Sequence, residues 1–139
     1  MIYVDTSVLV AAFTNEAATD RSIAYLKIAS TGLVISWFVE TEFSAALSIK
    51  LRRGHIDVAE RNIALREFRR YVKATLTICH VRRRHFISAS DYADMHLTGL
   101  RAGDAIHLAI AADVGASLCT LDHQLAQAGS QLGVSTVLV

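Results

Sequence analysis

The sequence has 139 residues, of which 53% are hydrophobic and 19% charged, with no proline and a net charge of only +1. This composition excludes a disordered chain, and no run reaches the roughly 20 apolar residues that a membrane-spanning helix needs. The length predicts one domain over residues 1–139, and the N-terminus lacks the basic start of a signal peptide, so a cytoplasmic location is expected.

Strands and helices alternate along the first half of the chain. The stretch Ile2-Tyr3-Val4 is short and apolar and predicts a buried strand. Thr6 and Ser7 can cap a helix after it. The elements expected here are a strand over 2–4, helices over 8–13 and 17–29 (the second closed by Gly32), a strand over 33–35, and helices over 37–53 (ended by Gly54) and from 57 to about 73.

The same alternation continues in the second half. The elements expected are a strand over 76–81, a helix over 84–100, a helix starting near 103–104 and running to 112, a strand over 117–121, a helix from 122 to about 132, and a strand over 135–139. This order predicts a three-layer α/β/α fold with a central parallel sheet of about five strands. Ligands of such sheets bind beyond the carboxyl ends of the strands.

Acidic side chains fall at that edge. Asp5 and Asp122 each follow a predicted strand, and Asp104 lies near the start of a helix. Glu42 is expected to point inward, because its neighbours at helical spacing are all apolar (Phe38, Val39, Ala45 and Ala46). Since an unpaired inward carboxylate is costly, a cation would offset that cost.

Oxygen-rich side chains at one edge suit a hard divalent cation, so Mg²⁺, or Mn²⁺ in its place, is predicted. Each acid also has a simpler interpretation. Asp5 and Asp122 can be helix N-caps, and Asp104 can be an early-helix acid favoured by the dipole. Capping and metal binding are compatible, so both interpretations stay open.

Four segments in register resemble the motifs of PIN-domain proteins, with the spacing of VapC-type toxins. They are Val4-Asp5-Thr6-Ser7-Val8-Leu9, Thr41-Glu42-Phe43-Ser44-Ala45-Ala46-Leu47, Leu100-Arg101-Ala102-Gly103-Asp104-Ala105-Ile106-His107-Leu108-Ala109 and Cys119-Thr120-Leu121-Asp122. The resemblance implies a PIN fold, a Mg²⁺- or Mn²⁺-dependent nuclease, a homodimer, and an antitoxin that fills the site. It departs from the usual pattern at Gly103, where alanine is commoner, and at His123.

The resemblance also assigns roles to residues. Asp5, Glu42, Asp104 and Asp122 become the catalytic and metal-binding set, and Thr6 and Thr120 become hydroxyl neighbours. The implied reaction is endonucleolytic hydrolysis of RNA by water, which leaves a 5′-phosphate and a 3′-hydroxyl. A phosphatase with Asp5 as nucleophile ranks low, because Ser7 stands where a second acid is needed. A non-cleaving PIN-like module that binds RNA or a protein is the main alternative.

The basic residues are concentrated in the middle of the sequence. Residues 50–84 hold eleven basic and three acidic residues, a net charge of +8, while the remainder carries −7. This asymmetry predicts a polyanion partner, an acidic peptide partner, or both. The candidate RNA- or antitoxin-binding residues are Arg52, Arg53, Arg66, Arg69, Arg70, Lys73, Arg82, Arg83 and Arg84.

One histidine and the two cysteines have simple structural interpretations. His107 lies one helical turn from Asp104 and can contact the site, but a half-buried, hydrogen-bonded side chain is the favoured interpretation. Cys79 and Cys119 share no metal-type spacing and are predicted to be buried free thiols.

Overall fold

The computed structural model describes residues 1–29 and 32–139. Within them, five strands form one sheet in the order β3-β2-β1-β4-β5, and every neighbouring pair is parallel. The strands are β1 (Ile2–Val4), β2 (Leu33–Ser36), β3 (Thr77–Cys79), β4 (Ser117–Thr120) and β5 (Thr136–Leu138). The predicted central parallel sheet of about five strands is therefore confirmed.

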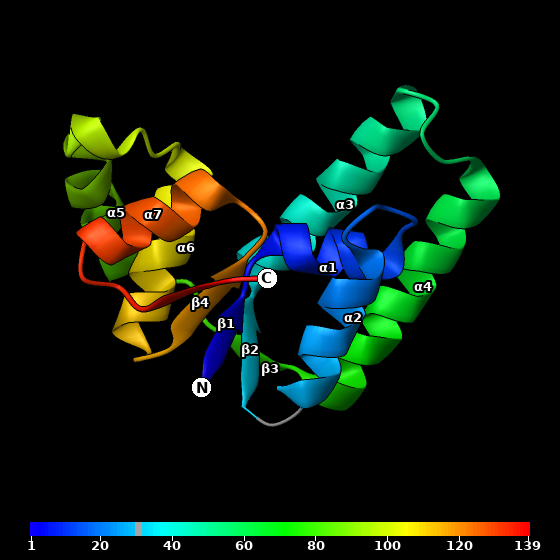
Figure 1. The fold of residues 1–139 in the computed structure, drawn as a ribbon, viewed down its shortest axis with the longest axis horizontal. Helices are drawn as coiled ribbons and strands as arrows, with labels where there is room; N and C mark the ends of the chain where they lie inside the picture. Colours follow the sequence, from blue (N-terminus) through cyan, green and yellow to red (C-terminus); the bar gives the residue numbers. More distant parts are fainter. Residues whose placement is uncertain (30–31) are drawn as a thin grey trace.

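Helices cover the sheet on both faces (Figure 1). Those from α1 to α4 gather on one side and those from α5 to α7 on the other, which confirms the three-layer arrangement. The helices are α1 (Thr6–Phe13), α2 (Thr19–Ile28), α3 (Trp37–Arg52), α4 (Val58–Thr75), α5 (Arg83–Asp94), α6 (Ala102–Asp113) and α7 (His123–Gln131), with a 3₁₀ turn η1 (His96–Thr98) between α5 and α6. In the described part of the chain, no helix is long and apolar enough to cross a bilayer.

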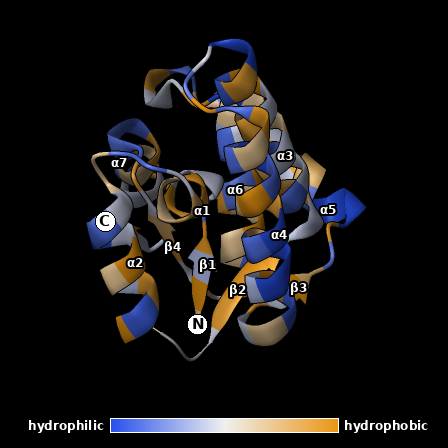
Figure 2. Cartoon of the chain, turned by 90° about the vertical axis from the view of Figure 1, so that its right-hand side faces the viewer, coloured by the Kyte–Doolittle hydropathy of each residue, from blue (hydrophilic) through white to orange (hydrophobic). Residues whose placement is uncertain are grey.

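The strands are apolar because helices bury them on both sides. Tyr3 and Val4 of β1 and Ile35 of β2 are fully buried, and the inner strands carry mostly hydrophobic residues (Figure 2). On the face covered by α3 and α4, the rings of Phe43 and Phe68 stack with centroids 3.9 Å apart. The α4 residues on this face, Leu65, Phe68 and Val72, are buried.

Some predicted boundaries are wrong. The helix expected over 84–100 ends at Asp94, and the chain continues through η1 to Gly99, whose φ is +65°. The strand expected over 76–81 covers only 77–79, because Leu76 still closes the last turn of α4. The helix expected over 17–29 covers Thr19–Ile28, and Gly32, with a φ of +78°, leads directly into β2.

The strand order fixes where a site can form. The central strand β1 pairs with β2 on one side and with β4 on the other. The chain moves outward from β1 through β2 to β3 and then returns to the opposite side of β1, so the order reverses there. Crevices at such reversals, beyond the carboxyl ends of the strands, are the usual binding sites of open parallel sheets. Asp5 follows β1 at this edge, and Thr120 ends β4 there.

Candidate active site

The four predicted carboxylates come together. Asp5, Glu42, Asp104 and Asp122 all line one open pocket of about 660 Å³. They come from the end of β1, from α3, from the first turn of α6 and from the start of α7. The acids are thus gathered from segments spread over most of the chain.

Asp5 is buried, with 6% of its surface exposed, and is held by hydroxyl groups. Its Oδ2 accepts hydrogen bonds from Ser7 Oγ at 2.5 Å and from Thr120 Oγ1 at 2.8 Å. It also caps α1 by accepting the Ser7 backbone N–H at 3.3 Å. The N-cap interpretation of Asp5 is therefore correct. All of these hydrogen bonds use Oδ2, and Oδ1 lies 3.5 Å from His107 Nε2.

Glu42 is half-buried and is held in the same way. Its Oε2 accepts hydrogen bonds from Thr6 Oγ1 at 2.5 Å and from His107 Nε2 at 2.6 Å. Burial raises the pKa of Glu42, but these hydrogen bonds outweigh it and hold the pKa below its usual value. Glu42 is therefore ionised at neutral pH, and the inward direction predicted for it is confirmed.

His107 is completely enclosed, with 2% of its surface exposed, rather than half-buried as the sequence suggested. Its Nδ1 lies 3.0 Å from the Tyr3 hydroxyl, which in turn lies 2.8 Å from Ser36 Oγ. Burial lowers the pKa of His107, but the hydrogen bond to Glu42 and the charges of the neighbouring carboxylates raise it above its usual value. Tyr3, Ser36 and His107 thus form a buried polar chain that ends on Glu42.

Asp104 and Asp122 carry out capping roles of their own. Asp104 Oδ2 accepts the Arg101 backbone N–H at 3.2 Å, which closes the first turn of α6. Asp122 Oδ1 accepts the backbone N–H groups of Gln124 and Leu125 at 2.8 and 3.1 Å at the start of α7. Both simpler interpretations are therefore correct, and both carboxylates still face the pocket.

A cation-binding geometry exists at one end of this pocket. Asp5, Glu42 and His107 each offer a ligand atom within 4.8 Å of the others. His107 Nε2 is 2.6 Å from a Glu42 oxygen, so it carries the proton of that hydrogen bond and is a donor to the carboxylate. The available ligands are then carboxylate oxygens, which fit a hard divalent cation that keeps several water ligands.

The two predicted hydroxyl neighbours touch the acids. Thr6 donates to Glu42, and Thr120 donates to Asp5. Other polar contacts were missed by the sequence reasoning, namely those of Ser7, Arg101 and the pair formed by Tyr3 and Ser36. Only the three-dimensional arrangement reveals the last pair, because each is an ordinary residue of a buried strand.

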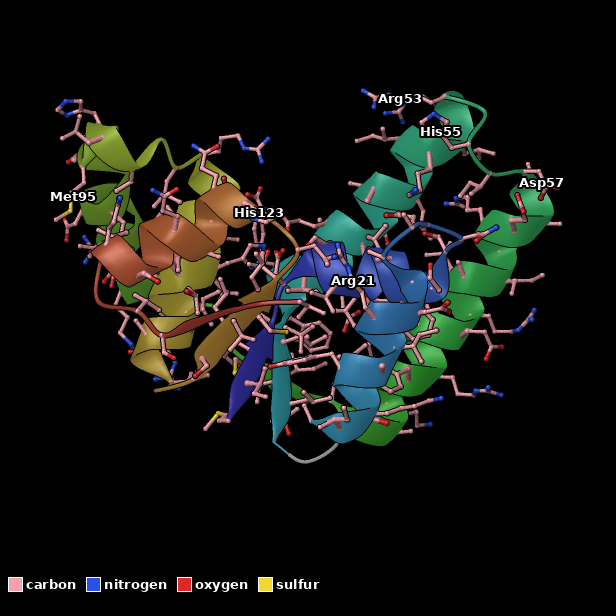
Figure 3. The ribbon with its side chains drawn as sticks, viewed as in Figure 1. Arg21, Arg53, His55, Asp57, Met95 and His123 are labelled. Carbon is pink, nitrogen blue, oxygen red and sulfur yellow. The ribbon has the colours of Figure 1, made fainter. Side chains whose placement is uncertain are left out.

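The predicted basic set lies elsewhere. All nine residues are exposed and, in the described part of the chain, none lines the pocket. Arg53 and His55 mark the tip where α3 and α4 meet, well apart from His123 at the start of α7 (Figure 3). Some of the set have partners of their own: Arg66 and Arg70 pair with Glu67, and Arg84 pairs with Asp113.

Several solved structures share this fold. One is the sarcin–ricin loop-cleaving toxin VapC20 of Mycobacterium tuberculosis, with a TM-score of 0.73 and 19% identity over 93% of this chain and 95% of that chain. Another is FitAcB of Neisseria gonorrhoeae, with a TM-score of 0.70 and 16% identity over 98% and 96%. VapBC2 of Rickettsia felis, bound to a promoter DNA fragment, has a TM-score of 0.71 and 14% identity over 100% and 99%.

No curated protein matches the chain. The family comparison is decisive instead, since the PIN domain matches residues 2–130 and so takes in all four pocket carboxylates. With this match, the parallel sheet and the acidic pocket beyond its central strands, the chain belongs to the PIN-domain family.

Proposed function

We propose that this protein is a divalent-metal-dependent endoribonuclease and the toxin of a type II toxin–antitoxin pair, with residues 1–139 acting as one domain. The observation that carries the proposal is the convergence of Asp5, Glu42, Asp104 and Asp122 on one pocket. Membership in the PIN-domain family supports it as well. Without a bound metal ion, the four carboxylates of this pocket would repel the phosphates of RNA.

Mg²⁺ is the proposed cofactor, and Mn²⁺ can substitute for it, because both prefer carboxylate and water ligands. Asp5 and Glu42 would hold the ion, with Asp104 and Asp122 completing the acidic set around it. When bound, a divalent ion lowers the pKa of water and neutralises charge on the phosphate.

The protein's own groups would position these carboxylates. Ser7 and Thr120 fix Asp5 through one oxygen, and Thr6 and His107 fix Glu42 through one oxygen. The other oxygens, Asp5 Oδ1 and Glu42 Oε1, would then bind the ion. In the proposed reaction, water oxygen bonds to phosphorus and the bond from phosphorus to the 3′ oxygen breaks. A proton passes to that oxygen, which leaves a 3′-hydroxyl and a 5′-phosphate.

The proposed partners are an RNA substrate, an antitoxin and a second copy of this chain. Similar structures from Rickettsia felis and nontypeable Haemophilus influenzae are VapBC complexes, and one from Klebsiella pneumoniae is a toxin–antitoxin complex, which supports an antitoxin here. The exposed basic set from Arg52 to Arg84 would contact RNA or the antitoxin, outside the pocket itself.

The test is cleavage of defined RNAs by the purified protein with Mg²⁺ or Mn²⁺. Suitable substrates are a transfer RNA, a hairpin with the sarcin–ricin loop sequence and an unstructured messenger RNA fragment. Asp5→Asn removes a proposed ligand, while Asp91→Asn makes the same change at an exposed position outside the pocket. We expect the wild type and Asp91→Asn to cut only with metal and Asp5→Asn to lose activity.

Product ends and metal binding separate the alternatives. A 5′-phosphate and 3′-hydroxyl support hydrolysis by water, whereas a 2′,3′-cyclic phosphate overturns it. Equal cleavage by all three preparations indicates a contaminating nuclease. If no RNA is cut and no Mn²⁺ binds, the non-cleaving binding module is the correct function instead.

A further inference from the structure

The pocket that gathers the four carboxylates extends beyond them along α1 and α3. This extension is lined by apolar side chains, Val10 of α1 and Ala45, Ala46 and Ile49 of α3. Ile49 stands seven residues after Glu42, which is about two turns or 10 Å farther along the helix. The whole pocket, of about 660 Å³, is as large as typical small-molecule sites. It therefore has an acidic part and an apolar part, and one nucleotide can span the two.

A fifth carboxylate, that of Glu16, lines the same pocket and is held in place by its neighbours. Glu16 lies in the loop between α1 and α2. Its Oε1 lies 2.7 Å from Lys50 Nζ of α3 and accepts a hydrogen bond from Thr14 Oγ1 at 3.1 Å. Its backbone N–H donates to Thr19 Oγ1 at 2.9 Å. Within the described residues, both side-chain contacts use Oε1 and none reaches Oε2, so Oε2 can accept a hydrogen bond from a ligand.

An apolar surface beside a fixed carboxylate matches the chemistry of a nucleobase. The faces of an unstacked base pack on apolar side chains, and its edge carries hydrogen-bond donors and acceptors. Because an ionised carboxylate only accepts hydrogen bonds, it favours an edge with an amino group, as in cytosine, over one with a carbonyl oxygen, as in uracil. The ion pair with Lys50 also offsets the charge of Glu16, which lessens its repulsion of a phosphate.

We propose that the apolar part of the pocket holds the base of a nucleotide whose 5′-phosphate lies at the acids, and that Glu16 selects a base with an exocyclic amino group. This inference rests on the proposed ribonuclease function and deepens it, because it names what the site would recognise in the RNA. The continuity of the apolar part with the acidic part favours a nucleotide over a peptide, since a nucleotide carries its phosphate and its base on one sugar.

The experiment measures the binding of 5′-mononucleotides to the protein by calorimetry in the presence of Mn²⁺, so no cleavage is needed. Two pairs of nucleotides isolate the amino group. The monophosphates of cytidine and uridine differ by an amino group in place of a carbonyl oxygen, and those of guanosine and inosine differ by its presence or absence.

Three variants are compared with the wild type. Glu16→Ala removes the carboxylate. Asp20→Ala removes the same charge at an exposed position of α2 outside the pocket and is the matched control. Ile49→Ala shortens the apolar surface, and because this side chain is 40% exposed, the variant should fold. Titration of each variant with Mn²⁺ alone measures whether the metal site is intact.

We expect the wild type and Asp20→Ala to bind the amino member of at least one pair about fivefold more tightly, and Glu16→Ala to bind both members equally. Ile49→Ala should bind all four nucleotides several-fold more weakly and Mn²⁺ as tightly as the wild type. No preference in the wild type, or a preference that survives in Glu16→Ala, would overturn the role of Glu16. If the wild type binds Mn²⁺ but no nucleotide, the base site is wrong, and cleavage of RNA still decides the proposed function. If it binds no Mn²⁺ either, both proposals fail.

Discussion

The Tyr3 hydroxyl lies in the middle of a buried polar chain. It contacts Ser36 Oγ on one side and His107 Nδ1 on the other, and all three residues are buried. Burial raises the pKa of Tyr3 far above its usual value, so the hydroxyl keeps its proton. In such surroundings each polar group depends on its neighbour, because water cannot replace a lost partner.

Tyr3→Phe should therefore destabilise the protein by about 1–3 kcal/mol, since it leaves two buried groups without their partner. Urea unfolding of the variant and the wild type measures the difference. Tyr25→Phe is the control, because within the described residues no hydrogen bond reaches that hydroxyl, and its effect should be about 0.5 kcal/mol or less. Equal losses in the two variants would contradict a special role for Tyr3.

Gly103 leaves room for the Glu42 carboxylate. A methyl group built at Gly103 would lie 3.1 Å from Glu42 Oε1 and 3.8 Å from the Phe38 ring. Thr6 and His107 both donate to the other oxygen, Oε2, so Oε1 accepts neither of these hydrogen bonds. Alanine at this position would therefore press on a proposed metal ligand.

Gly103→Ala should have two opposite effects. The backbone of α6 should gain stability, by up to about 1 kcal/mol, because alanine favours helix over glycine. The affinity for Mn²⁺ should fall several-fold, since Glu42 Oε1 must shift. Thermal unfolding without metal and Mn²⁺ titration measure the two effects, and unchanged affinity would show that the carboxylate moves freely.

The sequence was sufficient to predict the acids, because Asp5 and Asp122 follow strands, Asp104 begins a helix and Glu42 has apolar neighbours at helical spacing. The two threonines were predicted from the resemblance to PIN-domain motifs. It could not predict how they are held. His107 looked like an ordinary half-buried histidine, since its contacts with Tyr3 and Glu42 span 104 and 65 residues of sequence. Arg101 was overlooked for the opposite reason: it stands alone, whereas the predicted basic residues are clustered.

Between elements, one ion pair ties the start of α5 to the end of α6. Arg84 contacts Asp113 through Nε at 2.7 Å and Nη2 at 2.6 Å, and the buried His85 lies 2.9 Å from the same carboxylate. Because His85 Nδ1 accepts the Arg82 backbone N–H, its Nε2 donates to Asp113. The hydrogen bonds from Arg84 and His85 hold the pKa of Asp113 well below its usual value.

A depressed pKa gives a stability that depends on pH. The contribution of Asp113 is fully present above its pKa in the unfolded chain, about 3.9, and is lost as the pH falls through the lower folded value. Asp113→Asn should be less stable than the wild type at pH 7, and the gap should narrow as the solution becomes more acidic. Unfolding in urea from pH 7 down to about pH 2 tests this. A constant gap would show that the carboxylate charge is unimportant.

The elements themselves were mostly predictable, and their ends were less so. The helix expected over 84–100 stops at Asp94, although residues 84–98 contain no proline or glycine. After the break, the Gln124 side chain of α7 donates to the carbonyl oxygens of Gly99 at 2.8 Å and Thr98 at 3.5 Å, so tertiary contacts hold this segment beside α7. A side chain at Gly99 would also collide with Gln124. Such contacts cannot be read from a local pattern.

At the scale of the whole molecule, apolar side chains are exposed on α5 and η1. Phe86, Ile87, Met95 and Leu97 are 53%, 47%, 54% and 88% exposed. Met95 marks the outer edge of this side of the molecule, away from the tip of α3 and α4 (Figure 3). Exposed apolar surface is typical of protein interfaces, and we propose that the homodimer covers these side chains.

Leu97→Asp should then shift the protein from dimer to monomer, because a charge would be buried in the interface. Light scattering coupled to size exclusion measures the mass. Val58→Asp, at an exposed position on α4, is the control and should leave the mass unchanged. If the wild type is already monomeric at micromolar concentration, the proposal that a homodimer covers these side chains is wrong.

The distances along the chain between the pocket acids have a consequence for how the protein would respond to its surroundings. Asp5 and Glu42 come from separate elements and meet only in the folded state, so the unfolded chain would have no comparable place for an ion. Any ion bound there would act as a ligand of the native state, adding about 2.7 kcal/mol of stability at a hundred times its dissociation constant. The lifetime of the protein against proteolysis would then follow the supply of free divalent metal.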